Sequence, residues 1–512
     1  MSPNRTRRWW ALAALDLGVL AVGLDVTVLS VALPTLAGAL KASESDLQWF
    51  SSAYALVLAV GMLPAGVLGD RFGRKRILLG ALMLFGAGSI LCAYSVNPAE
   101  FIAGRVLLGA AGAAIVVMAL SVMTVLFSEE ERPRAVGIWA AANFLALPVG
   151  PIFGGWLLTN YWWGWIFLMN VPVALLGLLA VLTLVPESRA SEKPSLDPVG
   201  MVAISAGLAG VTYGLIELGR NGWTDARSLA VLAAGVFLAV AFFVWERRLT
   251  NRPGGRPLID LALFRSRGFT WGTGLAALGG LALIGMVFTL PQYSQGVLGL
   301  DAEGAGVRLL PLIAGMIVGA VPADRIAQRA GARLTVALGF GITAAGLVIG
   351  AGTAAGSSAL FVGAWTAIVG CGMGLGFATA ASAALKTVPS EKSGVASALI
   401  QAMQKVGAPL GSAIFGSVLV TVYQSSLKLN GLPPAAAHAV KRSVFAGAAV
   451  ATELSSPALL GSVRHSFVQG MDAALLFSAG IAAIAVVAAL VFLPGRDTVA
   501  SGTETSLVEK VA

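Results

Sequence analysis

The chain has 512 residues, of which 57% are hydrophobic and only 12% carry a charge. A soluble globular protein carries about 25% charged residues, so this composition excludes an ordinary soluble domain and indicates a membrane protein. The net charge of +9 does not indicate a nucleic-acid partner, because the position of each Lys and Arg relative to the membrane matters more here. Cys92 and Cys371 both lie in apolar segments and do not form a disulfide framework.

The first apolar stretch, near residues 9–33, contains Asp25 near its centre. The stretch is long enough to cross a bilayer, where a charged side chain costs about 2.5–3.5 kcal/mol. We therefore expect Asp25 to face protein or water and to have a function. The alternative is a carboxyl group that stays protonated or merely caps a packed helix. No small-residue cleavage site precedes Asp25, which favours a retained span over a signal peptide.

Fourteen apolar stretches are long enough to span a bilayer. Their approximate limits are 9–33, 49–69, 77–95, 101–126, 134–157, 165–185, 199–219, 228–246, 269–291, 305–323, 334–354, 359–385, 394–423 and 473–493. Most of the 34 Lys and Arg residues lie near the termini and in alternate loops. By the positive-inside rule, both termini are predicted to be cytoplasmic and the long loop at 424–472 extracellular. Only Arg105 and Lys405 fall inside spans.

An internal repeat relates the two halves of the chain. Residues 135–155 align with 393–413, and a weaker match relates 66–76 to 319–333. Both matches are offset by eight spans, as expected for two six-helix bundles with two helices between them, and parallel repeats of six helices build one large transporter class. Chance matching among Gly-rich helices is the alternative. The domains predicted from this repeat are 1–198 (first bundle), 199–268 (two linking helices and a cytoplasmic loop) and 269–512 (second bundle).

The loop between the second and third spans reads GVLGDRFGRK from Gly66 to Lys75. Its glycines allow a tight turn that presents one carboxylate and several cations at the membrane surface. This loop resembles the signature loop of the major facilitator superfamily, and the resemblance extends over almost the whole chain. The resemblance implies a gating role for the motif residues, which are Gly66, Gly69, Asp70, Arg71, Gly73 and Arg74.

The fifth span contains a second motif, which resembles one associated with antiporters. Gly150 and Gly154 share one helix face and would allow close packing, while Pro151 removes a backbone donor and should bend the helix. Gly155 completes the motif. Helix packing without a transport role is the alternative.

The first and fourth spans resemble the fourteen-span drug:proton antiporters of this superfamily. The resemblance rests on the segment from Leu24 to Pro34 and on the segment that begins with Arg105. It implies that Asp25 carries the coupled proton and that Arg105 tunes proton exchange. Burial favours a neutral carboxyl and a nearby cation favours the charged form, so such a site can bind and release protons in turn. The alternative for Arg105 is that it extends to the outer surface.

Several polar residues are candidates for contact with a substrate, namely Asn143, Gln401, Gln404 and, near an outer helix end, Glu217. The best-known cation exporters of the family have additional carboxylates where this chain has, by our alignment, Met316, Gln401 and Lys405. We therefore expect monocationic or neutral substrates rather than dications. Hydrogen bonding between helices is the alternative role of the two glutamines.

The sequence thus predicts an all-α membrane protein with fourteen transmembrane helices and the major facilitator fold. The expected function is proton-coupled export of hydrophobic, drug-like compounds across the cytoplasmic membrane by a monomer. No metal or other cofactor is expected, and the glycine-rich stretch 370–376 lacks the strand and lysine of a phosphate-binding loop. One alternative is a facilitator or exporter of one metabolite. A membrane enzyme or assembly factor is less favoured, because the spans contain no convergent catalytic groups.

Overall fold

The computed structural model describes residues 5–127, 131, 135, 146, 149–189, 197–252, 261–386, 393–429 and 431–494. Throughout these ranges the regular elements are helices, and there is no strand. The prediction of an all-α chain is therefore confirmed. The chain divides into two compact units, which we describe separately.

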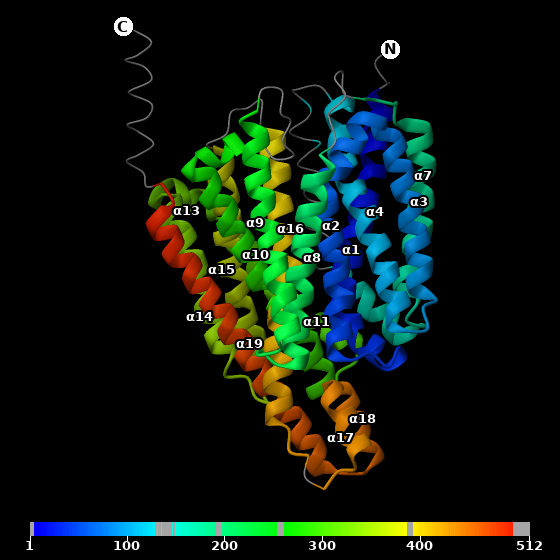
Figure 1. The fold of residues 1–512 in the computed structure, drawn as a ribbon, viewed down its shortest axis with the longest axis vertical. Helices are drawn as coiled ribbons and strands as arrows, with labels where there is room; N and C mark the ends of the chain where they lie inside the picture. The colour runs from blue at the N-terminus through cyan, green and yellow to red at the C-terminus, as the bar shows by residue number, and fades with distance from the viewer. Residues whose placement is uncertain are drawn as a thin grey trace. The chain divides into compact units, whose positions relative to one another are not determined.

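The first unit comprises Met1–Leu258, Val287–Arg308 and Ala408–Met471. Its helices are α1 (Arg5–Ala39), α2 (Glu44–Phe72), α3 (Arg74–Ala93), α4 (Pro98–Leu126), α6 (Trp165–Leu168), α7 (Asn170–Leu184), α8 (Pro198–Asn221), α9 (Ala226–Thr250), the π-helix η2 (Tyr293–Val297), α11 (Ala302–Val307), α17 (Pro434–Arg442) and α18 (Val444–Glu453). In this unit α1 packs against α4 and α7, and α3 also packs against both of them (Figure 1). The buried face of α1 is therefore enclosed by other helices.

The second unit comprises Ile259–Met286, Leu309–Gly407 and Asp472–Ala512. Its helices are η1 (Leu261–Arg265), α12 (Leu310–Ala320), α13 (Ala323–Ala330), α14 (Ala332–Gly350) and α15 (Ala359–Lys386). Three long helices have residues in both units, and these are α10 (Arg267–Gln292), α16 (Ser393–Ser426) and α19 (Pro457–Phe492). The two units are thus discontinuous in sequence, and the expected domain boundaries stay a prediction.

Eleven described helices are long and apolar enough to cross a membrane, or twelve if the two arms of α2 count as one span. The arms of α2 meet at an angle of 48° next to Pro64, and a proline inside a helix is a common cause of such a bend. These twelve segments coincide with twelve of the fourteen expected spans. Of the other two, the one at 134–157 extends over residues outside the described ranges, although 149–160 are helical. The one at 394–423 lies within helix α16.

Glycine pairs allow α12 and α15 of the second unit to approach closely. A Cβ atom at Gly319 would clash with the Cys371 carbonyl oxygen, and one at Gly374 would clash with that of Met316. Small residues at such positions let two helix backbones meet. The glycines of the stretch 370–376 therefore serve helix packing.

The expected outer loop at 424–472 contains more helix than the apolar pattern indicates. Helices α17 and α18 lie within it, and α19 begins at Pro457 rather than near 473. The hydropathy pattern marks only the apolar part of a helix, whereas the helix itself continues as long as its backbone hydrogen bonds and packing continue. The Tyr423 hydroxyl donates to the Val440 carbonyl at 2.8 Å and to the Ser443 carbonyl at 3.2 Å, which joins α16 to α17 and α18.

Capping residues explain where two helices of the first unit begin. The Ser43 backbone N–H donates to the Asp46 carboxylate at 2.7 Å, and the Ser43 hydroxyl accepts from the Asp46 backbone N–H, forming a capping box for α2. The Asn97 side chain accepts from the Glu100 backbone N–H at 3.0 Å at the start of α4. Such caps satisfy donors that a helix leaves unpaired.

Candidate functional site

Asp25 of α1 and Arg105 of α4 form an ion pair inside the first unit. Arg105 Nη1 lies 2.5 Å from Asp25 Oδ2, and the side chains are 1% (Arg105) and 0% (Asp25) exposed. Arg105 therefore does not extend to the surface. The structure brings together two residues that lie 80 positions apart in the chain, and each provides the charge that the other needs when buried.

Helix α2 also holds the Arg105 guanidinium. Arg105 Nε donates to the Phe50 carbonyl oxygen at 3.0 Å, and the guanidinium lies 4.3 Å from the centroid of the Tyr54 ring. This distance is typical of a cation–π contact. The Tyr54 hydroxyl donates to the Val22 carbonyl oxygen of α1 at 3.3 Å. Arg105 is therefore held by a carboxylate, a carbonyl and a ring, which restricts its orientation.

Asn170, the first residue of α7, lies near the other carboxylate oxygen of Asp25, Oδ1. Its Nδ2 is 3.5 Å from Asp25 Oδ1 and 3.4 Å from the Ser89 hydroxyl of α3. Both contacts are long, so they are weaker than the ion pair. The Asp25 carboxylate is thus surrounded by groups from five helices, namely α1, α2, α3, α4 and α7.

Sequence reasoning did not assign Tyr54, Asn170 or Ser89 to this site. The available signal was a polar side chain within an apolar span, but Ser and Tyr are common in spans and do not identify a partner. Only the packing of the helices shows which of them reach the ion pair.

The arrangement is suited to handling one proton. The ionised pair is neutral overall, and protonation of Asp25 would leave Arg105 without its counter-charge. Breaking a buried pair in this way costs about 3–5 kcal/mol unless the surroundings change. Proton binding at Asp25 would therefore favour a rearrangement that gives Arg105 water or another partner.

The expected gating loop connects α2 to α3 through Gly73, whose φ of +114° is accessible mainly to glycine. Arg74 donates to Asp70 Oδ1 from Nε at 3.0 Å and from Nη2 at 2.9 Å, and Arg74 Nη1 donates to the Ser121 carbonyl oxygen at 3.2 Å. The Asp70–Arg74 pair therefore ties this loop to the end of α4.

The loop also contacts a carboxylate that sequence reasoning missed. Glu187, which follows α7, accepts from the Lys75 backbone N–H at 3.2 Å and lies 3.6 Å from Arg76 Nε. A Cβ atom at Gly73 would lie 2.5 Å from this carboxylate. Glu187 thus sits at the N-terminus of α3, where a negative charge is favourable.

The remaining loop residues have packing contacts. A Cβ atom at Gly69 would clash with the Met118 side chain, whereas one at Gly66 would lie an ordinary 3.5 Å from Val117. The Arg71 guanidinium lies 5.7 Å from the Phe72 ring centroid.

The glycines of the antiporter-like motif pack against α1 beside Asp25. A Cβ atom at Gly150 would clash with the Thr27 hydroxyl, and one at Gly154 would lie 2.5 Å from Val28 Cγ1. The Thr27 hydroxyl also donates to the Ala146 carbonyl oxygen at 3.0 Å. This side of α1 therefore has no room for larger motif residues.

The other two motif residues face a different neighbour. A Cβ atom at Gly155 would lie 2.7 Å from the Ala302 carbonyl oxygen, and one at Gly306 would clash with the Pro151 carbonyl oxygen. Both contacts are therefore with α11.

Of the four substrate candidates, Glu217 is the one whose side chain the structure describes. Asn143 lies outside the described residues, as do the side chains of Gln401 and Gln404. Glu217 accepts a hydrogen bond from Asn221 at 3.0 Å near the end of α8, so it lies at a helix terminus rather than beside Asp25.

Residues 15–412 match the sequence profile of the Major Facilitator Superfamily. The chain belongs to the major facilitator superfamily. It is 33% identical over 95% of its length to the tetracenomycin C resistance and export protein of Streptomyces glaucescens, covering 92% of that protein. It is 32% identical over 96% of its length to the multidrug efflux pump LfrA of Mycolicibacterium smegmatis, covering 96% of it. It is 32% identical over 92% of its length to the methyl viologen resistance protein SmvA of Salmonella typhimurium, covering 95% of it.

Solved structures support the same fold for this major facilitator protein. A bacterial homologue of the human lysosomal transporter Spinster, in an inward-facing conformation, aligns with a TM-score of 0.68 over 96% of this chain and 98% of that one, at 18% identity. A D-xylose–proton symporter aligns with a TM-score of 0.59 over 95% and 98%, at 16% identity. The family match and the relatives named as efflux or export proteins identify the protein as a transporter and not an enzyme.

Proposed function

We propose that this major facilitator protein exports hydrophobic small molecules, monocationic or neutral, in exchange for protons across the cell membrane. The relatives support the export of drug-like compounds, because they are named for resistance, export or multidrug efflux. The excess of Lys and Arg in alternate loops supports cytoplasmic termini. A monomer suffices for this function, because the proposed proton site lies within one chain.

The observation that carries the proposal is the buried Asp25–Arg105 pair. A carboxylate inside a membrane protein is costly, and proton relays are one of the main uses of such residues. Asp25 binds the proton in this mechanism, and Arg105 favours its release by stabilising the charged carboxylate. The Phe50 carbonyl and the Tyr54 ring hold Arg105 in place during the exchange.

The substrate class follows from the charge of this pair. Asp25 carries one negative charge, and its ion pair with Arg105 is neutral overall. A dication near this site would leave one of its charges without a partner in a poorly solvated place. A single positive charge, or none, is therefore the better match.

The proposal is tested with the Asp25→Asn variant in proteoliposomes that contain only this protein. The variant keeps the size of the side chain but cannot ionise, so we expect it to lose ethidium accumulation driven by a pH gradient. Glu453→Gln, which neutralises an exposed carboxylate at the end of α18, serves as the matched control and should transport normally. Gradient-driven accumulation by Asp25→Asn would refute the role of Asp25.

A further inference from the structure

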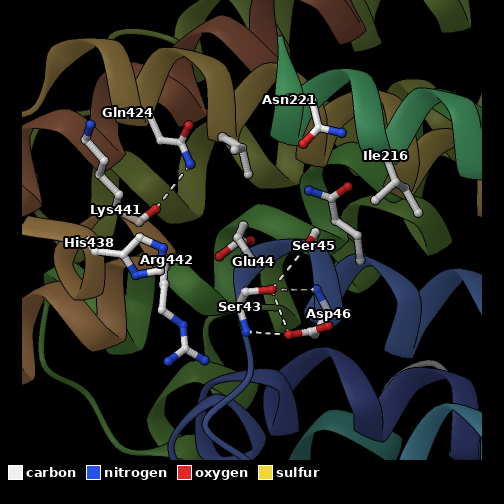
Figure 2. A pocket seen from close by; sticks show the side chains of 12 residues that line it. Ser43, Glu44, Ser45, Asp46, Ile216, Asn221, Gln424, His438, Lys441 and Arg442 are labelled. Atoms are coloured by element: carbon white, nitrogen blue, oxygen red, sulfur yellow. Dashed lines mark hydrogen bonds between the residues drawn. The ribbon is translucent and has the colours of Figure 1, made fainter. Parts of the chain in front are cut away.

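A pocket of about 410 Å³ lies in the first unit, and neither Asp25 nor Arg105 lines it. Its walls are the first turns of α2, the last turns of α8 and α16, and helix α17 (Figure 2). Binding sites for small molecules have volumes of about 300–1,000 Å³. We call this site the α2–α17 pocket.

One wall of the α2–α17 pocket contains buried acceptors to which the described residues donate no hydrogen bond of ordinary geometry. Glu44 is 4% exposed, and among the described residues neither of its carboxylate oxygens has a hydrogen bond of ordinary geometry. The Gln292 amide lies near the Glu44 carboxylate, but the two groups do not have the distance and angle of an ordinary hydrogen bond. Gln48 is 1% exposed, and its Oε1 also has no described partner. Buried acceptors are nearly always satisfied in native proteins, so this wall is suited to a ligand with N–H donors.

Another wall carries basic side chains. His438, Lys441 and Arg442 line the pocket from α17, with His438 and Arg442 on the opposite side of Glu44 from Asn221 (Figure 2). Arg442 donates from Nη2 to the Lys41 carbonyl oxygen, which holds the guanidinium at the edge of the pocket. This wall is suited to an anionic group.

The two walls have opposite chemical character. Glu44 and Asp46 are acidic side chains, whereas Lys441 and Arg442 are basic ones. A simple cation would satisfy Glu44 but face the basic wall. A simple anion would approach Arg442 but leave Glu44 without a donor. A neutral molecule with separated charges matches both walls.

We propose that the α2–α17 pocket binds a small zwitterion. Its primary ammonium group donates to Glu44 and Gln48, since an ammonium has three N–H donors. Its carboxylate or other anionic group faces His438 and Arg442. This binding requires no proton gradient and does not depend on the proposed transport function.

The test uses four probes with six-carbon chains and the full-length protein in lipid nanodiscs. The probes are 6-aminohexanoate, hexylammonium, hexanoate and the N-trimethyl derivative of 6-aminohexanoate, which keeps the positive charge without N–H donors. Calorimetry should show the tightest binding for 6-aminohexanoate, with each other probe weaker by about tenfold or more. Equal binding of hexylammonium and 6-aminohexanoate would overturn the zwitterion assignment, as would the absence of 6-aminohexanoate binding.

Variants then assign the two ends of the ligand. Glu44→Gln should weaken 6-aminohexanoate binding about tenfold or more, whereas the exposed control Glu453→Gln should leave it unchanged. Arg442→Gln should weaken 6-aminohexanoate but not hexylammonium, and this readout stays informative if Glu44→Gln folds poorly. An unchanged affinity in a folded Glu44→Gln protein, or a parallel loss of both probes in Arg442→Gln, would contradict the proposal.

Discussion

At the scale of single residues, the Asp25–Arg105 pair shows why a buried charge needs a specific partner. Both side chains are almost completely buried, and their shortest contact is 2.5 Å. Removing one member leaves the other charged in a place that water does not reach. Removing both leaves two neutral groups, which is a smaller penalty.

We therefore predict that Arg105→Met destabilises the protein by about 3–5 kcal/mol. The double variant Asp25→Asn/Arg105→Met should be less destabilised than the sum of its two single variants. The measurement is a double-mutant cycle of unfolding free energies in detergent. Additive effects within about 0.5 kcal/mol would show that the two side chains are not coupled.

At the scale of elements, the first unit depends on helices that approach closely through small residues. The segment at 149–160 packs its Gly154 against Val28 of α1, with 2.5 Å between Val28 Cγ1 and a Cβ atom added at Gly154. Neighbouring atoms must move before a methyl group fits there. By contrast, a Cβ atom at Gly80 of α3 would meet nothing within 4 Å.

Gly154→Ala should therefore destabilise the protein by about 1–3 kcal/mol through overpacking. Gly80→Ala is the matched control, and it should be neutral or stabilising by about 0.5–1 kcal/mol, because alanine favours a helix over glycine. Melting temperatures in one detergent compare the two variants. Equal melting temperatures would show that α1 can move to accommodate the methyl group.

The turn between α2 and α3 is a second element that can be tested. Asp70 receives two N–H donors from Arg74, and Asp70→Asn weakens this charge-assisted contact without a large change of shape. We expect turnover to fall about tenfold while equilibrium affinity for ethidium stays the same. Ethidium binding in detergent and ethidium transport in proteoliposomes separate the two effects. Lost affinity with normal turnover would place Asp70 at the substrate instead.

At the scale of the whole molecule, the proposed preference for monocations over dications depends on how few carboxylates the substrate meets during transport. Met316 of α12 lies where related cation exporters have a carboxylate, according to the resemblance in the sequence. Its carbonyl oxygen lies close to Gly374 of α15, and this backbone contact does not require a methionine side chain. Position 316 can therefore be changed without removing the α12–α15 contact.

We predict that the unmodified protein exports ethidium, a monocation, in preference to methyl viologen, a dication. Met316→Asp should shift this preference toward methyl viologen, because it adds a second carboxylate for the second charge. Met316→Asn is a polar control without the charge and should keep the original preference. Transport of both dyes is measured in the same vesicles. Efficient methyl viologen export by the unmodified protein would contradict the assumed charge of the path.

The sequence by itself determined the helical membrane architecture and the position of the most unusual residue. Apolar runs and the placement of Asp25 are local properties, so they are visible without coordinates. The twelve described spans therefore coincide with predicted ones. Local patterns failed where helices continue beyond apolar runs, as at the start of α19, because hydropathy does not measure backbone hydrogen bonding.

Only the tertiary structure decided which side chains meet. Arg105 is joined to Asp25 across 80 positions, and Tyr54 and Asn170 reach the pair from two further helices. The pocket that Glu44 lines likewise includes residues of α17, far along the chain. Such contacts are set by helix rotation and by the distance between helix axes, which depend on the packing of all neighbouring side chains at once. A motif in the sequence can indicate a functional residue, but it does not contain this geometry.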